Sequence, residues 1–356
     1  MPIHESTPEL KESTSWLVYF QYLIYGSVIL YFGRDILVPL SFALLISFVL
    51  YPSCAWMERK GVGRMTAIII HVVILIAAAA IVFMVLVQQV VLFMDEWPSV
   101  QEKFLDMLSD LSGTLASGLG ISPEQQALFV SSLGKQAAES TWTIITRAIS
   151  FSTVSAVFLI LVPVYAVLIL YYRHHWVNVL YRLVPSERTE DTHALLLLTV
   201  KTYFNFIKGM GIVYLAVGIL NSIGLWILGI PHPFLFGFIA SVLTFIPYVG
   251  IMAGSLLPIA MAWTTYDSIW YPVGVVGVFT VVQYLEANII FPFAVSKRLK
   301  VNTLVVLIAI FAGGLLWGVA GMILFVPFIG IAKLIADHNP HMKTLSMILG
   351  VREVDK

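Results

Sequence analysis

The chain alternates between long apolar runs and short polar or charged segments. We predict membrane-spanning helices at about residues 16–32, 36–57, 65–94, 151–172, 207–228 and 271–295, because each run is long enough to cross a bilayer. A membrane β-barrel would instead show alternating segments of about ten residues. The pattern therefore predicts an all-α membrane protein, a polytopic helical bundle with about six full spans.

Two further apolar runs, residues 234–263 and 303–332, are interrupted by residues that end or bend helices. Each run is either a bent span or a re-entrant hairpin. Their interrupting residues, interpreted as hairpin tips and gates, are Pro247, Tyr248, Gly250 and Pro258 in the first run, and Gly313, Gly314, Gly318, Gly321 and Pro327 in the second.

The distribution of basic residues favours hairpins. Basic residues in short loops prefer the cytoplasm, which places the basic segments 58–64 and 173–188, and hence the N-terminus, inside. If residues 234–263 crossed once, Lys297, Arg298 and Lys300 would lie outside. A hairpin keeps them inside, and a second, opposed hairpin keeps the C-terminus cytoplasmic too. The C-terminal half then forms an inverted repeat, in which transporters place binding sites near the midplane.

These patterns divide the chain into five sections. Residues 1–94 hold an N-terminal tail and three scaffold spans, and residues 95–150 form extracytoplasmic amphipathic helices. Residues 151–206 hold the fourth span and a cytoplasmic amphipathic section. Residues 207–336 form the transport core, and residues 337–356 form a cytoplasmic tail. We expect a multi-pass protein of the inner (plasma) membrane.

Composition supports the membrane class and excludes others. The chain is 59% hydrophobic and only 11% charged, against about 25% charged in a soluble domain. A net charge of zero gives no sign of nucleic-acid binding, and Cys54, the single cysteine, cannot form an intrachain disulfide. No phosphate-binding loop, hydrolase motif or cofactor signature is present, so we expect neither an enzyme nor a cofactor. Asp337, His338 and His341 lie in a polar tail, and no metal site is predicted.

Glu286 is the main candidate for function. A carboxylate near a membrane midplane costs roughly 2.5–3.5 kcal/mol on insertion scales, so such residues usually face a water-filled pathway or a partner. Gln283 lies three residues earlier on the same helix face, and Asn288 and Pro292 follow. Asn221 sits midway along the fifth predicted span. These residues are candidates for a substrate or ion pathway, with helix-to-helix hydrogen bonding as the structural alternative.

Four motifs in order resemble the autoinducer-2 exporter family of membrane transporters. They are residues 229–231 (GIP), 245–250 (FIPYVG), 283–292 (QYLEANIIFP) and 313–327 (GGLLWGVAGMILFVP). The resemblance implies a secondary transporter assembled as a ring-like homo-oligomer, such as a pentamer. It also implies either export of the quorum-sensing signal autoinducer-2 or antiport of sodium or lithium against protons. Ile251 departs from the family, in which many members carry a second proline at this position.

We therefore expect a secondary active transporter that exports a small polar solute, such as autoinducer-2. Glu286 would alternate between protonated and charged states as the hairpins expose it to each side, coupling export to a proton or sodium gradient. Three alternatives remain open: a sodium (lithium)/proton antiporter, a passive oligomeric pore, and a membrane scaffold. The partners expected are the lipid bilayer, the solute, and H⁺ or Na⁺.

Overall fold

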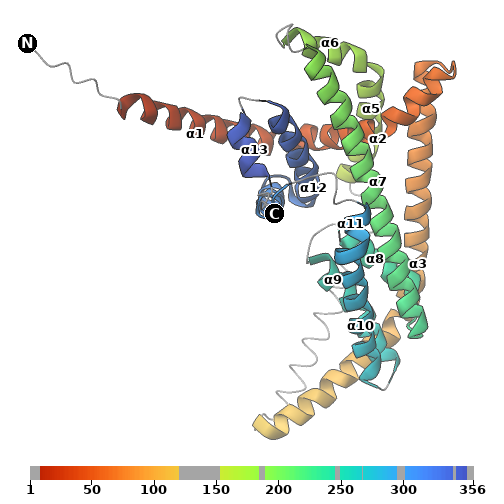
Figure 1. The fold of residues 1–356 in the computed structure, drawn as a ribbon. Helices are drawn as coiled ribbons and strands as arrows, with labels where there is room; N and C mark the ends of the chain where they lie inside the picture. Colours follow the sequence, from red (N-terminus) through yellow and green to blue (C-terminus); the bar gives the residue numbers. More distant parts are fainter. Residues whose placement is uncertain are drawn as a thin grey trace, which may run out of the picture. The chain divides into compact units, whose positions relative to one another are not determined.

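The structure of the 356-residue chain is a computed structural model (Figure 1). It describes residues 9–119, 153–183, 189–244, 249–266, 268–294, 301–339 and 342–350. Within these ranges the chain is helical, and the one extended pairing is an isolated bridge between Val301 and Gly350. The predicted all-α class is confirmed.

The helices follow one another with few long connections. Their bounds are α1 Glu9–Phe32, α2 Arg34–Arg59, α3 Arg64–Leu119, α5 Thr153–Tyr171, α6 Arg173–Leu183, α7 Thr189–Ile227, α8 Pro233–Leu243, α9 Val249–Thr265, α10 Trp270–Leu285, the π-helical turn η2 Glu286–Ile290, α11 Phe291–Ala294, α12 Thr303–His338 and α13 Lys343–Leu349.

The chain packs as two compact units. The first combines Met1–Phe48, Leu161–Thr199 and Lys300–Lys356, so it holds α1, α6, α12 and α13. The second combines Val49–Ile160 and Val200–Leu299, so it holds α3, most of α7, and α8 to α11. The division into five sections along the sequence stays a prediction.

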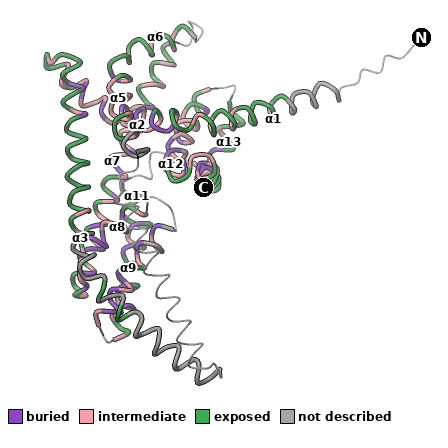
Figure 2. Tube along the Cα trace, turned by 180° about the vertical axis from the view of Figure 1, so that it is seen from behind, coloured by how far each residue is buried: buried purple, intermediate pink, exposed green. Residues whose placement is uncertain are grey.

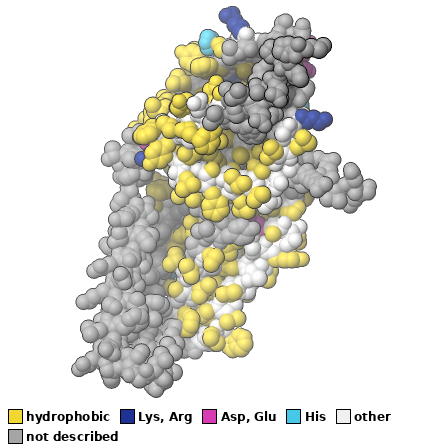
Figure 3. Space-filling model, turned by 90° about the vertical axis from the view of Figure 1, so that its left-hand side faces the viewer, with side chains coloured by type: hydrophobic (Ala, Val, Ile, Leu, Met, Phe, Trp, Pro, Cys, Tyr) yellow, Lys and Arg dark blue, Asp and Glu magenta, His cyan; other side chains and the backbone are white. Residues whose placement is uncertain are grey.

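Among the described residues, five helices are long and apolar enough to cross a membrane: Arg34–Arg59, Arg64–Val85, Glu190–Ile227, Trp270–Ala294 and Thr303–His338. A sixth candidate is the pair Phe158–Tyr171 and Arg173–Arg182, which bends by 62°. Hydrophobic side chains also cover much of the described surface on the face drawn in Figure 3. The chain is a multi-pass membrane protein, as the apolar runs predict.

Two helices run further than the sequence pattern suggests. The helix of the third predicted span does not end at Met94, because α3 continues through Pro98 to Leu119. The amphipathic section before residue 207 is not a separate helix either, since α7 is continuous from Thr189 to Ile227. A change of composition marks a change of surroundings, but it does not by itself supply a residue that terminates a helix.

The first interrupted run is two helices that pack against each other. A Cβ added to Gly250, at the start of α9, would lie 1.9 Å from the Leu243 carbonyl oxygen at the end of α8. One added to Gly254 would lie 2.7 Å from the Cα of Ala240. With 11 residues, α8 spans only about 16 Å, against a bilayer core of about 30 Å. The α8–α9 pair therefore has the dimensions of a re-entrant hairpin.

The second interrupted run folds back on itself at Gly318. Gly318 has φ 62° and ψ −143°, a backbone conformation that side chains disfavour, inside the 36 residues of α12. A Cβ on Gly321 would lie 2.0 Å from the Gly313 carbonyl oxygen, although residues eight apart in one helix are about 12 Å apart. The Trp317 and Phe325 rings also meet edge to face at 5.4 Å. By length α12 could cross a membrane, but its geometry is that of two packed legs.

Polar contacts hold both ends of the α12 hairpin in the first unit. At the tip, Trp317 Nε1 donates a hydrogen bond to the Leu30 carbonyl at 2.8 Å, which satisfies an acceptor in the last turn of α1. At the open end, Asp337 accepts from Lys333 and from Ser346 Oγ of α13. The hairpin is thus tied to α1 at one end and to α13 at the other.

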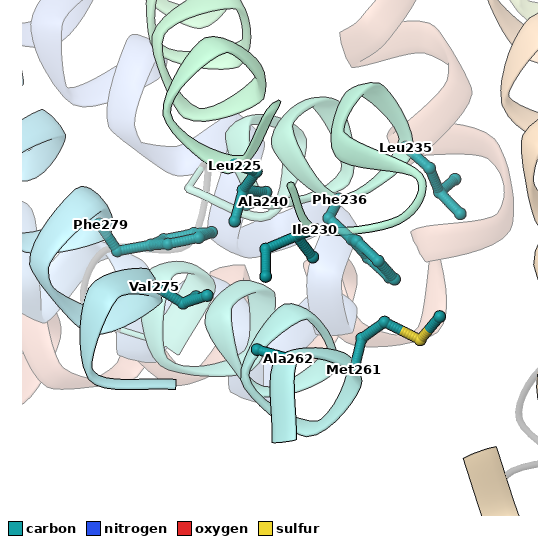
Figure 4. Packing of buried hydrophobic residues seen from close by; sticks show 9 residues of the cluster. All are labelled: Leu225, Ile230, Leu235, Phe236, Ala240, Met261, Ala262, Val275 and Phe279. Carbon is teal, nitrogen blue, oxygen red and sulfur yellow. The ribbon is translucent and has the colours of Figure 1, made fainter. Parts of the chain in front are cut away.

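The core of the second unit lies where α7, α8, α9 and α10 meet. Figure 4 shows its side chains gathered between these helices, and Figure 2 shows the buried positions concentrated there, while much of α3 is exposed. The cluster consists of Leu225, Ile230, Leu235, Phe236, Ala240, Met261, Ala262, Val275 and Phe279. It fixes the α8–α9 hairpin against the two long helices that carry Asn221 and Gln283.

The contact between the α12 legs can be tested with glycine substitutions. We expect Gly321→Ala to lower stability by about 1–3 kcal/mol, because the added methyl overpacks the second leg against Gly313. Gly277→Ala on α10 is the matched control, since its methyl meets nothing within 4 Å; it should raise stability by about 0.5–1 kcal/mol. Thermal unfolding of both purified variants measures the difference. Equal stabilities would show that α12 does not fold back at Gly318.

Candidate functional site

Glu286 lies at a local change of helix geometry. It opens the π-helical turn η2, and the Phe291 N–H donates to its carbonyl across five residues. Pro292 follows, and because proline lacks an N–H and crowds the preceding turn, a widened turn suits this position. Single π-helical turns occur frequently at functional sites, where they re-aim a side chain.

The Glu286 side chain is buried among helices rather than exposed. It is 8% exposed, and its Oε2 has no hydrogen-bond partner among the described residues. Tyr214 of α7 lies near enough for the Glu286 charge to act on its hydroxyl. An apolar cluster that includes Val213, Val217 and Val282 packs α7 against α10 beside it. A carboxylate so enclosed is unfavourable when charged and unpaired.

A small cavity lies one helical turn before Glu286. Its volume is about 10 Å³, which is room for about one water molecule. Helices α7, α8, α9 and α10 all contribute to it, and Glu286 does not. The lining residues are Val217, Asn221, Ala240, Thr244, Ile251, Phe279, Val282 and Gln283.

Asn221 is the most enclosed polar group of this cavity. It is 4% exposed, and its Oδ1 has no hydrogen-bond partner among the described residues. The Thr244 hydroxyl donates to the Ala240 carbonyl at 2.8 Å and retains its acceptor capacity. The structure therefore brings Asn221 and Gln283 together, as the sequence suggests, and adds Thr244.

Asn288 does not join this group. Its side chain is exposed, and its Nδ2 donates to the Tyr284 carbonyl of its own helix at 2.9 Å. Ser222, next to Asn221, is fully buried but donates to the Gly218 carbonyl at 2.7 Å. Both side chains satisfy backbone carbonyls one turn earlier instead of facing the cavity.

Close packing of α7 against α8 positions the cavity. A Cβ on Gly237 would lie 2.3 Å from Ser222 Oγ, so α8 approaches α7 at a contact between small residues. Ser241 of α8 donates to the Tyr214 carbonyl of α7 at 2.5 Å. These contacts set where α8 ends, and therefore where Thr244 lies.

The predicted tip residues of the hairpins have different outcomes. Pro247 and Tyr248 lie outside the described residues. Gly250 and Pro258 are buried in α9. The tip residues of the second run, Gly313, Gly314, Gly318, Gly321 and Pro327, all lie in α12 and belong to the first unit.

The described residues contain no group of three His, Cys, Asp or Glu side chains that could hold a metal ion. Within the polar tail, Asp337 is engaged by Lys333 and Ser346, and His338 Nδ1 lies 2.9 Å from the Leu334 carbonyl oxygen. His341 lies outside the described residues.

Comparison with known families decides the class of protein. Residues 20–340 match the family described as AI-2E family transporter. The chain belongs to the AI-2E transporter family.

Relatives of this AI-2E transporter extend over nearly its whole length. It is 25% identical over 320 residues to YrrI of Bacillus subtilis (strain 168), covering 87% of this chain and 88% of YrrI. It is 25% identical over 321 residues to YhhT of Escherichia coli (strain K12), covering 89% of each. Both names describe only candidate transport proteins. It is 23% identical to the AI-2 transport protein TqsA of Escherichia coli (strain K12), over 89% of this chain and 90% of TqsA.

Two residues of the site escape sequence reasoning. Thr244 directly follows α8, but its place in the cavity depends on how the hairpin packs against α7 and α10. Tyr214 lies far from Glu286 in sequence, and only the pairing of their helices brings the two together. The position of Thr244 just before the 245–250 motif of the AI-2E transporter was the one available signal.

The cavity distinguishes two amides that look alike in sequence. We expect Gln283→Leu to lower transport about 2- to 10-fold, the loss that corresponds to one hydrogen bond of ~0.5–1.5 kcal/mol. Asn288→Ala should leave transport unchanged, because its amide is exposed and bonded to its own helix. Flux in proteoliposomes, at matched protein content, compares the two. A larger loss with Asn288→Ala would move the pathway to the other face of α10.

Proposed function

We propose that this AI-2E transporter is a secondary active transporter that exports a small polar solute, such as autoinducer-2, coupled to a proton or sodium gradient. The observation that carries the proposal is Glu286, a buried carboxylate with an unpaired oxygen at a π-helical turn of a candidate membrane span. Ionisable residues inside membrane spans usually mark ion pathways or proton relays. The AI-2 transport protein TqsA, a relative over most of the chain, supports the choice of solute.

Coupling follows from the two charge states of Glu286. Protonation neutralises the carboxyl and removes the penalty for enclosing it among Val213, Val217 and Val282. Deprotonation restores that penalty, so the charged form favours a conformation in which water or a cation reaches the site. A carboxyl that must be neutral when enclosed and charged when open can link proton movement to opening and closing of the α8–α9 hairpin.

The sodium (lithium)/proton antiporter is the second candidate, and the cavity supplies the observation in its favour. A volume of about 10 Å³ holds no organic solute in this conformation, although a single water or small ion fits. Export of a larger solute therefore requires the α8–α9 hairpin to move, whereas ion exchange requires less movement.

Assembly and location are part of the same proposal. The spans before Tyr172 would provide a scaffold for a ring-like homo-oligomer, and many apolar side chains on α1 and α3 are exposed in the single chain, available to lipid or to other copies. The protein would lie in the inner (plasma) membrane with both termini in the cytoplasm, as the basic segments favour.

The decisive variant is Glu286→Gln. It keeps the shape of the side chain but removes its charge and its titration, so proton-coupled flux should be lost while the protein still folds. Stability should hold or rise, because the charged state no longer has to be buried. Glu190→Gln, an exposed carboxylate at the start of α7, is the matched control and should transport normally. Autoinducer-2 flux and a pH-sensitive dye in the same proteoliposomes measure the coupling.

Each other result names a different role for Glu286. If Glu286→Gln lowers the melting temperature or dissociates the assembly, the residue joins helices instead of coupling transport. Full coupled flux in a stable Glu286→Gln variant would end the proposal. Sodium-driven proton release without autoinducer-2 flux in the wild type would select the antiporter.

Membrane orientation can be tested separately. Cysteines introduced near Gly118 should react with an impermeant reagent from outside, and those near Arg188 and Lys300 only from the cytoplasm, because basic segments remain inside. Labelling in intact cells and in inverted vesicles provides the two arms, in a Cys54→Ser background. Outside labelling at Lys300 contradicts the re-entrant assignment of residues 234–263.

A further inference from the structure

The cavity beside Asn221 is incomplete as it stands. Asn221 is buried, its Oδ1 has no hydrogen-bond partner among the described residues, and it lines the cavity together with Thr244 and Gln283. Buried polar atoms in folded proteins nearly always have a partner in protein or in ordered water. The geometry therefore requires an occupant that donates a hydrogen bond to Asn221.

The size and chemistry of the cavity limit that occupant. About 10 Å³ accommodates one water-sized group, and a buried water typically makes two to four hydrogen bonds. Asn221, Thr244 and Gln283 supply three polar partners, and amide and hydroxyl groups both donate and accept. A water or a hydroxyl satisfies all three.

A bare cation fits less well. None of the residues that line the cavity is acidic, and five of the eight are apolar, Phe279 among them. Removing the hydration shell of an ion is very unfavourable unless charged or multiple oxygen ligands replace it. Glu286 does not line the cavity, so its charge is not a direct ligand there.

We propose that this cavity is a subsite for one neutral hydroxyl-sized group, occupied by an ordered water at rest and by a hydroxyl of the solute during transport. This inference rests on the proposed transport function and assigns the recognition of a neutral solute to Asn221, Thr244 and Gln283. Coupling belongs to Glu286, a turn away. Because Thr244 directly follows α8, opening of the α8–α9 hairpin would take apart the subsite and release the hydroxyl.

The matched pair of variants is Asn221→Leu and Ser222→Ala. Leucine has nearly the shape of asparagine but offers no acceptor, so the subsite should lose its water while the protein stays folded. Ser222 is the adjacent buried residue on α7, but its hydroxyl is bonded to the Gly218 carbonyl and does not line the cavity. Both purified variants are compared with the wild type by thermal unfolding and by an experimental structure that resolves ordered waters.

The expected structural result is an ordered water within hydrogen-bonding distance of Asn221 in the wild type and in Ser222→Ala, and none in Asn221→Leu. The water should be the same in sodium chloride and in choline chloride. A dry cavity in the wild type overturns the proposal. Stabilisation by sodium chloride or lithium chloride over choline chloride, abolished by Asn221→Leu, also overturns it, because the ligand is then a cation.

Flux of autoinducer-2 in proteoliposomes tests the second half of the proposal. We expect Asn221→Leu to lower it about 2- to 10-fold, the effect of one lost hydrogen bond, and Ser222→Ala to leave it unchanged. Normal flux in a folded Asn221→Leu variant overturns the assignment to solute recognition. Failure of coupling at Glu286 is a different result, because the ordered water and its independence of sodium are measured without transport.

Discussion

The rest of this structure depends on the free energy of enclosing a polar group where water is scarce. Helices satisfy their own backbone, so the cost falls on side chains and on the places where helices end. Two side-chain atoms of the second unit, Asn221 Oδ1 and Glu286 Oε2, carry this cost without a described protein partner. They lie on neighbouring helices, α7 and α10 with its π-helical turn. Unpaired buried groups are unfavourable in a static fold, and this is the reason to place function there.

Glycine makes the surrounding architecture possible. Gly250 and Gly254 let α9 lie against α8, Gly237 lets α8 lie against α7, and Gly313 with Gly321 brings the legs of α12 together. Without a hydrophobic driving force in lipid, such close approach supplies the packing that holds helices together. Both interrupted runs therefore use the same device, although they belong to different units and turn at different residues.

The AI-2E family match gives these two features their meaning. A carboxylate at a π-helical turn and a polar cavity of water size, lying a turn apart, divide a transport site into a group that can change charge and a group that can recognise a neutral partner. The closed cavity and the hairpin that ends at Thr244 point to the same moving part. Solute size and hairpin position are then linked, because the subsite exists only while α8 stays against α7 and α10.

By itself the sequence determined the class, the spans and the exceptional residues. Apolar length, Gly and Pro breaks and a carboxylate at Glu286 are local properties, readable without knowing what packs against what. The extents of α3 and α7 were not readable, because a change of composition contains no signal that ends a helix. Tertiary structure alone decided that Gln283 shares a cavity with Asn221 and Thr244 while Asn288 faces away. Which side chains converge depends on helix rotation and close contact, and these follow from packing between segments distant in sequence.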